Sequence, residues 1–176
     1  MAAKDGAPSE WHLRYLYLRH LMGLQPDKVA SGLLEKASKM SHQLTMYGKA
    51  IASVFLPDGG YNQAAQRNVK SLLEYTVVNP EMGRYFDTHR AQQTLSYRIP
   101  TQVATIEALQ QSEAASEVAD VEAVVEEMPL WLLQAKRTQL WETSRATTDA
   151  VYALLIAGNK DNAVAALTNQ TPLSYT

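Results

Sequence analysis

The sequence has no cysteine, and this absence removes several classes of protein at once. Without cysteine the chain forms no disulfide, holds no thiolate-bound metal and offers no thiol nucleophile. The histidines at positions 12, 20, 42 and 89 are then its only nitrogen ligands for a transition metal, and none stands in an HExxH motif. We therefore predict no metal and no other cofactor.

Long apolar runs are missing as well. No stretch approaches the roughly 20 apolar residues that a membrane-spanning helix needs. The first ten residues also lack the apolar core of a secretion signal. The sequence therefore predicts no contact with a membrane, and a virion or cytoplasmic location is expected.

Catalytic motifs are equally scarce. The serines lack the GxSxG pattern of a nucleophile elbow, and no Gly-rich loop is followed by Lys-Ser or Lys-Thr. The single place where an acid, a base and anion-binding groups come together is residues 84–90, where Asp87 and His89 stand between two arginines. Because this cluster matches no known catalytic spacing, we expect a protein that is not an enzyme and has no small-molecule substrate.

The composition is that of a folded domain with a divided charge. The 176 residues are 46% hydrophobic and 19% charged, which predicts a single domain with a core of its own. Residues 1–100 carry twelve Lys and Arg against eight Asp and Glu, whereas residues 101–176 carry four against ten. This division favours packing within the chain or between copies, and the basic excess is too small to indicate a nucleic-acid footprint by itself.

Apolar periodicity predicts a first helix at residues 10–23 and a long second helix at residues 29–55. In the first, Trp11, Tyr15, Leu18 and Met22 share one face. The second has the strongest pattern in the chain, with apolar residues three or four positions apart. They are Val29, Leu33, Ala37, Met40, Leu44, Tyr47, Ile51 and Phe55. Gly32 and Gly48 within this span suggest close packing or a slight bend.

Glycine and proline then divide the rest of the chain. A turn at residues 57–60 separates the long helix from helices expected at 62–76 and at 79–96. The first of these carries the apolar stripe Ala65, Val69, Leu72 and Thr76, and Asn79 is expected to start the second. A further helix is expected at 101–128, with a break near 111–115, and Pro129 is expected to start a second long helix that Gly158 ends. A short helix at 161–167 precedes an extended tail at 168–176, and residues 1–9 form an N-terminal arm. The predicted fold is all-α, an elongated bundle of five to six helices with the two long helices as its spine.

Aromatic and basic residues alternate in the first helix, a pattern typical of sites for single-stranded nucleic acid. The residues concerned are Arg14, Tyr15, Arg19 and His20, to which Arg84 and Arg90 add if the fold brings them close. The alternative, which we favour, is that Trp11, Tyr15 and Leu18 form a buried face while the arginines are solvated. Arg14 and Arg19 then have no ligand.

A second group of aromatic residues lies in the predicted last helix. Trp131, Trp141 and Tyr152 flank its main apolar stripe, and large aromatic side chains outside a core face often anchor an interface. They are equally able to close the bundle against the first helix.

These patterns favour a non-enzymatic structural or interaction protein that self-associates or packs into a larger assembly. A virion or phage structural component is the concrete form that we expect, because the chain offers no reactive chemistry and is rich in Ala, Gln and Thr. The alternative is a nucleic-acid-binding or packaging protein that uses the N-terminal aromatic and basic helix.

Overall fold

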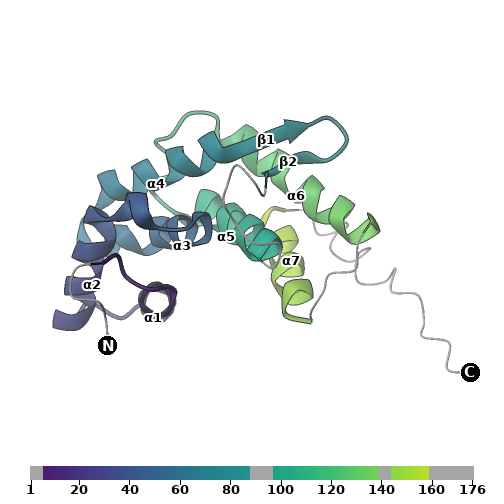
Figure 1. The fold of residues 1–176 in the computed structure, drawn as a ribbon. Coiled ribbons are helices and arrows are strands. Elements are labelled where there is room, and N and C mark those ends of the chain that lie inside the picture. Colours follow the sequence, from purple (N-terminus) through teal and green to yellow (C-terminus); the bar gives the residue numbers. More distant parts are fainter. Residues whose placement is uncertain (1–5, 88–96, 139–143, 159–176) are drawn as a thin grey trace, which may run out of the picture.

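Helices make up most of the computed structural model, which describes residues 6–87, 97–138 and 144–158 (Figure 1). They are α1 (Glu10–Leu21), α2 (Lys28–Lys39), α3 (Met46–Phe55), α4 (Asn62–Tyr75), α5 (Arg98–Gln111), α6 (Val121–Thr138) and α7 (Ser144–Ile156). Two short 3-10 helices, η1 (Ser41–Gln43) and η2 (Leu56–Gly59), and the strands β1 (Thr76–Asn79) and β2 (Gly83–Phe86) complete the described elements. The predicted helical class is confirmed, with one small hairpin that the sequence reading missed.

Helix α3 lies at the centre of the packing. It contacts α1, α4 and α5, and α5 in turn contacts α6 and α7. Nearly every residue of α3 is buried, and Lys49 is its only charged residue, which is the composition of a helix covered on all sides. The buried apolar side chains form one cluster that runs from Leu13 in α1 to Ala153 in α7.

The expected long helix at 29–55 is wrong, because the chain breaks after Lys39 and restarts at Met46. The Thr45 hydroxyl accepts a hydrogen bond from the Gly48 amide at 3.0 Å and so caps α3. An apolar stripe with steps of three and four continues across such a break, so periodicity alone cannot find it. A Cβ on Gly48 would lie 3.1 Å from Leu13 Cδ1, which confirms close packing there, whereas Gly32 faces open space.

The turn at 57–60 and the helix that follows it are confirmed. Gly60 has a φ of +79°, a left-handed conformation that glycine adopts without strain. In α4 the predicted stripe of Ala65, Val69 and Leu72 is fully buried, and Thr76 directly after the helix is buried as well. Here the sequence pattern identified both the element and its inner face.

The helix expected at 79–96 is wrong, since residues 76–86 form an antiparallel hairpin. Instead of capping a helix, the Asn79 side chain accepts hydrogen bonds from the Glu81 and Met82 amides at 2.9 and 3.1 Å, which closes a turn. Gly83 has a φ of +73°, and a side chain there would strike the backbone of α6 at Glu127. Residues 88–96 of the prediction lie outside the described residues.

The acidic segment at 101–128 is divided between α5 and α6, which confirms the predicted break. Pro129 does not start a helix as expected but lies inside α6, which begins at Val121. The buried Gln102 side chain donates to the carbonyl oxygens of Arg84 and Met128 at 2.7 and 3.0 Å, so it ties α5 to β2 and α6. Helix α7 ends just before Gly158, which has a φ of +76°, as predicted.

The two ends of the chain are only partly described. Of the expected N-terminal arm, residues 6–9 lie against the body, with Pro8 buried and Ala7 packed on the core. The remainder of that arm, the short helix at 161–167 and the tail at 168–176 lie outside the described residues.

Candidate functional site

Exposed large apolar side chains gather on the outer face of α1. The helix contacts the core through Leu13 and Leu16, each 3% exposed, and Leu13 fits against Gly48 of α3. The opposite face carries Trp11, Tyr15, Leu18 and Met22, which are 79%, 39%, 56% and 63% exposed. The expectation that Trp11, Tyr15 and Leu18 form the buried face is therefore wrong.

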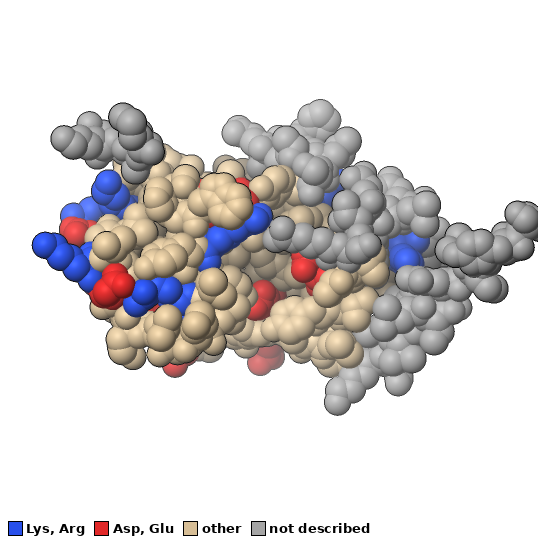
Figure 2. Space-filling view, turned by 90° about the horizontal axis from the view of Figure 1, so that it is seen from below, with Lys and Arg blue, Asp and Glu red and all other residues tan. Residues whose placement is uncertain are grey.

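Three more exposed apolar side chains follow this face along the chain. Leu21 ends α1, Leu24 lies in the connection to α2, and Val29 lies in the first turn of α2. Figure 2 looks at the molecule from below, the side on which α1 lies in Figure 1, and shows a broad tan surface interrupted by blue and red groups. We call the outer face of α1, defined by Trp11, Tyr15, Leu18 and Met22, the α1 face.

Arg14 stands at one edge of the α1 face and is already neutralised by the chain. Its guanidinium is 2.6 Å from the Glu10 carboxylate and lies over the rings of Trp11 and Tyr47, at 5.9 and 5.4 Å from their centres. The Tyr97 hydroxyl donates to the same carboxylate at 2.7 Å. Together these contacts anchor the first turn of α1 to α3 and to the start of α5.

Arg19 and His20 are paired in the same way at the other end of the helix. The Arg19 guanidinium is 2.9 Å from the Asp27 carboxylate, donates to the Tyr15 hydroxyl at 3.1 Å and lies 5.6 Å from the centre of the Tyr15 ring. His20 Nδ1 is 2.9 Å from the Asp58 carboxylate. Backbone amides of α2 and the charge of Arg19 hold the pKa of Asp27 below its ordinary value, which keeps this pair ionised.

Arg84, a further basic residue of the proposed nucleic-acid surface, does not join the α1 face. Arg84 lies on β2, on the far side of α3 and α5 from α1 in Figure 1. Its guanidinium is 2.7 Å from the Glu127 carboxylate and donates to the Thr76 hydroxyl at 3.0 Å. Arg90 and the neighbouring His89 lie outside the described residues.

The aromatic residues expected at an interface divide between the core and the surface. Trp131 is 3% exposed and stacks on Tyr85 with ring centres 6.1 Å apart. The guanidinium carbon of Arg98 lies 5.2 Å from the centre of the Trp131 ring. Trp131 therefore closes the core, as one of the two expectations had it. It packs against β2 and the start of α5, and not against the first helix. Tyr152 is exposed on α7 and its hydroxyl accepts from Gln111 at 3.2 Å. Trp141 lies outside the described residues.

Two buried polar contacts join helices that are distant in the sequence, and neither has a sequence signal. Lys49 Nζ donates to the Ser71 hydroxyl of α4 at 2.8 Å, and burial lowers the pKa of this amine. The Tyr17 hydroxyl donates to the Glu107 carboxylate of α5. Burial raises the pKa of Glu107 and also that of Tyr17, whose hydrogen bond to Glu107 adds to the effect.

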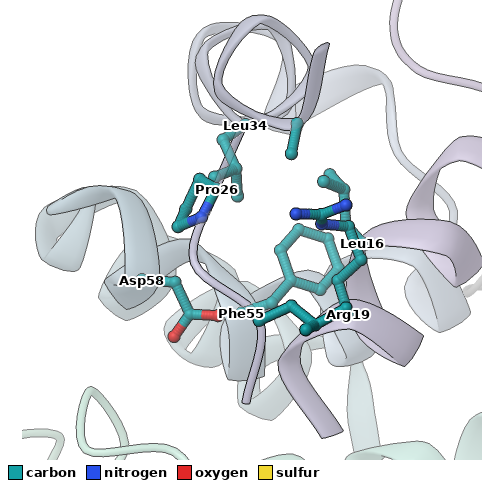
Figure 3. A pocket seen from close by; sticks show the side chains of 8 residues that line it. Leu16, Arg19, Pro26, Leu34, Phe55 and Asp58 are labelled. Atoms are coloured by element: carbon teal, nitrogen blue, oxygen red, sulfur yellow. The ribbon is translucent and has the colours of Figure 1, made fainter. Parts of the chain in front are cut away.

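A small cavity lies between α1, α2 and η2 (Figure 3). Its lining includes Leu16, Leu34 and Phe55, with Arg19 and Asp58 beside them. The volume is about 10 Å³, which is space for one water molecule, whereas pockets for organic ligands are typically hundreds of Å³. Among the described residues, no three His, Asp or Glu side chains are grouped to hold a metal ion.

Comparisons with protein-family models, with curated proteins and with solved structures returned no match. None of the helices within the described residues combines the length and the apolar character that crossing a membrane requires.

Proposed function

We propose that this chain is a non-enzymatic structural or interaction protein that self-associates through the α1 face. The observation that carries the proposal is the exposure of four large apolar side chains along one side of a single helix. Trp, Tyr and Met are enriched where proteins bind one another. A solvated helix of a monomer normally carries polar side chains at these positions.

The extent of the exposed surface supports the same role. Together with Leu21, Leu24 and Val29, the α1 face exposes the equivalent of about four whole large side chains. At about 150 Å² each, this is on the order of 600 Å², the upper end of the apolar patches that monomers carry. Two such surfaces joined would bury on the order of 1,200 Å², the lower end of specific protein interfaces.

The buried titratable groups also favour a structural role over catalysis. Lys49 with Ser71 joins α3 to α4, and Tyr17 with Glu107 joins α1 to α5. Within each pair, one side chain donates a hydrogen bond to the other between two packed helices. Buried polar groups are tolerated when they have such a partner. These contacts join helices of the body that presents the α1 face.

The charges around the α1 face favour a protein partner over nucleic acid. Arg14 and Arg19 each lie within 3 Å of a carboxylate of the same chain. Binding to phosphate depends on cations that release counterions from the nucleic acid, and an arginine paired with a carboxylate contributes less to this. A component of a virion or phage particle remains the concrete form of the proposal, because such a role requires contacts between copies.

Sedimentation and light scattering over a range of protein concentrations test the proposal. The wild-type chain should form dimers or larger species, and the Leu18→Gln variant should dissociate at least tenfold more readily. Burying a leucine at a contact contributes about 1.5–3 kcal/mol, and tenfold in affinity is about 1.4 kcal/mol. Val78→Gln is the matched control, because Val78 on β1 is also 56% exposed but lies away from α1.

A wild-type chain that stays monomeric at every concentration contradicts the proposal. So does an association that Val78→Gln weakens as much as Leu18→Gln. Larger species that vanish after nuclease treatment, with a salt-sensitive gel shift that needs Arg14 and Arg19, would instead support the nucleic-acid alternative.

A further inference from the structure

The α1 face has the spacing of a coiled-coil seam. Its four side chains follow one another by steps of four, three and four, which is the a and d pattern of a heptad repeat. Leu13 and Leu16 fall at positions that point away from such a seam, and they contact the core of the same chain. The helix is therefore able to pack on its own core and on a partner helix at once.

We propose that the partner is α1 of a second copy of the chain, packed antiparallel about a two-fold axis. This inference rests on the proposed self-association and adds its geometry. In this arrangement Tyr15 packs on the partner's Leu18. Trp11 packs on the partner's Met22, and each contact occurs twice because the interface is isologous.

The sizes of the side chains favour the antiparallel arrangement. Along the seam two aromatic residues come first and two aliphatic residues follow, so reversing one helix sets each aromatic ring against a flexible aliphatic chain. Methionine makes favourable contacts with aromatic rings and fills irregular space beside them. A parallel pair would instead stack Trp11 on the partner's Trp11 and leave the smaller side chains facing each other at the other end.

The positions of the arginines beside the seam also favour the antiparallel arrangement. Arg14 and Arg19 occupy the g and e positions, which face each other across a parallel coiled coil, so Arg14 would oppose the partner's Arg19 on both sides. In the antiparallel pair g faces g and e faces e. Arg14 then lies near the partner's Leu21, and the two arginines do not oppose each other.

The aromatic rings of the seam are already held in place in the single chain. The guanidinium of Arg14 lies over the Trp11 ring and that of Arg19 over the Tyr15 ring, and both arginines are fixed by carboxylates. Binding therefore costs less side-chain entropy than it would for two freely rotating aromatic residues. The aromatic half of the α1 face is therefore preorganised for contact with the aliphatic half of the partner's α1 face.

Disulfide cross-linking tests the geometry, because the full chain contains no cysteine that would give a background. The Tyr15→Cys and Leu18→Cys variants, distinguished by a size tag, are oxidised separately and as an equimolar mixture. The expected product is a disulfide between the two variants in the mixture, at least several times more abundant than the product of either variant alone. Trp11→Cys mixed with Met22→Cys should behave in the same way.

The other outcomes separate this inference from the proposed function. If each variant cross-links to itself and the mixture gives no excess of the mixed product, the helices are parallel and the inference is wrong. If sedimentation shows a dimer that depends on Leu18 but neither mixture cross-links, the self-association stands and the antiparallel geometry is wrong. If the chain is a monomer throughout, both fail together.

Discussion

Helices α1 and α4 pack on opposite sides of α3, yet the apolar stripe is exposed in α1 and buried in α4. In α4, Val69 and Leu72 are fully buried. In α1, Trp11 and Leu18 are largely exposed although they too share one face of their helix. Apolar periodicity therefore identifies a helix, but it does not identify the side that faces the core.

The difference arises from what surrounds each stripe. Apart from Ala64, Leu73 and Tyr75, the other positions of α4 are polar, so a single main apolar stripe is available and it becomes the inner face. Helix α1 has apolar residues on two faces, and Gly48 of α3 leaves a space that Leu13 fills. The larger side chains of the second face stay outside, where they are available for a partner.

The strongest test of this comparison removes one leucine from each helix. Leu72→Ala in α4 should lower the free energy of unfolding by about 2–5 kcal/mol, because it leaves a cavity in the core. Leu18→Ala in α1 should change it by less than about 0.5 kcal/mol, because Leu18 is exposed in the single chain. Urea unfolding of dilute, monomeric protein measures both, and equal losses in the two variants would contradict the assignment of the α1 face.

The next test concerns the buried polar contact that α1 makes. Tyr17→Phe removes the donor to Glu107 and should cost about 1–3 kcal/mol at neutral pH, because the buried carboxylate is left without its partner. Tyr15→Phe is the matched control, since its hydroxyl is on the surface and should matter little. Thermal unfolding of both variants measures the two losses of stability. A smaller loss for Tyr17→Phe than for Tyr15→Phe would count against the packing of α1 on α5.

The contact between Tyr17 and Glu107 predicts that the stability of the fold depends on pH. Burial raises the pKa of Glu107 above its ordinary value of 4.5, and the charge of Asp149 acts in the same direction. The folded chain then holds a proton that the unfolded chain releases, so this stabilisation is complete below about pH 4.5 and declines as the pH rises through the folded-state pKa. Glu107→Gln should flatten this part of the stability curve, and an unchanged curve would show that Glu107 does not titrate there.

The smallest expected effect concerns the corresponding contact of α4, where Lys49 donates to Ser71. Burial lowers the pKa of Lys49 below 10.5, so the charged amine weakens the fold, and stability rises with pH between the folded-state pKa and 10.5. Lys49→Met should raise stability at pH 7 by about 1 kcal/mol and abolish that rise. Lys39→Met, at an exposed lysine, should neither raise stability nor change its dependence on pH. A Lys49→Met variant that is less stable than the wild type would contradict the statement that burial of the Lys49 charge weakens the fold.

The candidate site was only partly predictable from the sequence. The alternation of Trp11, Arg14, Tyr15 and Arg19 drew attention to the helix that carries the α1 face. Glu10 lies one helical turn before Arg14, a spacing that indicates their ion pair. Asp27 lies beyond the end of α1, and no local pattern indicates its contact with Arg19. Contacts such as His20 with Asp58 and Tyr17 with Glu107 join residues 38 and 90 positions apart, and no local rule finds them.

The sequence by itself determined the helical class, the turn at residues 57–60, a break near residues 111–115, and the inner face of α4. These features depend on local backbone preference or on a single apolar face, and neither requires knowledge of distant residues. Only the tertiary structure decided that Thr45 divides the long stripe, that Asn79 closes a hairpin and that Trp11 faces outward. In each of these cases two local conformations or two faces are comparably favourable, and contacts with distant parts of the chain select one of them.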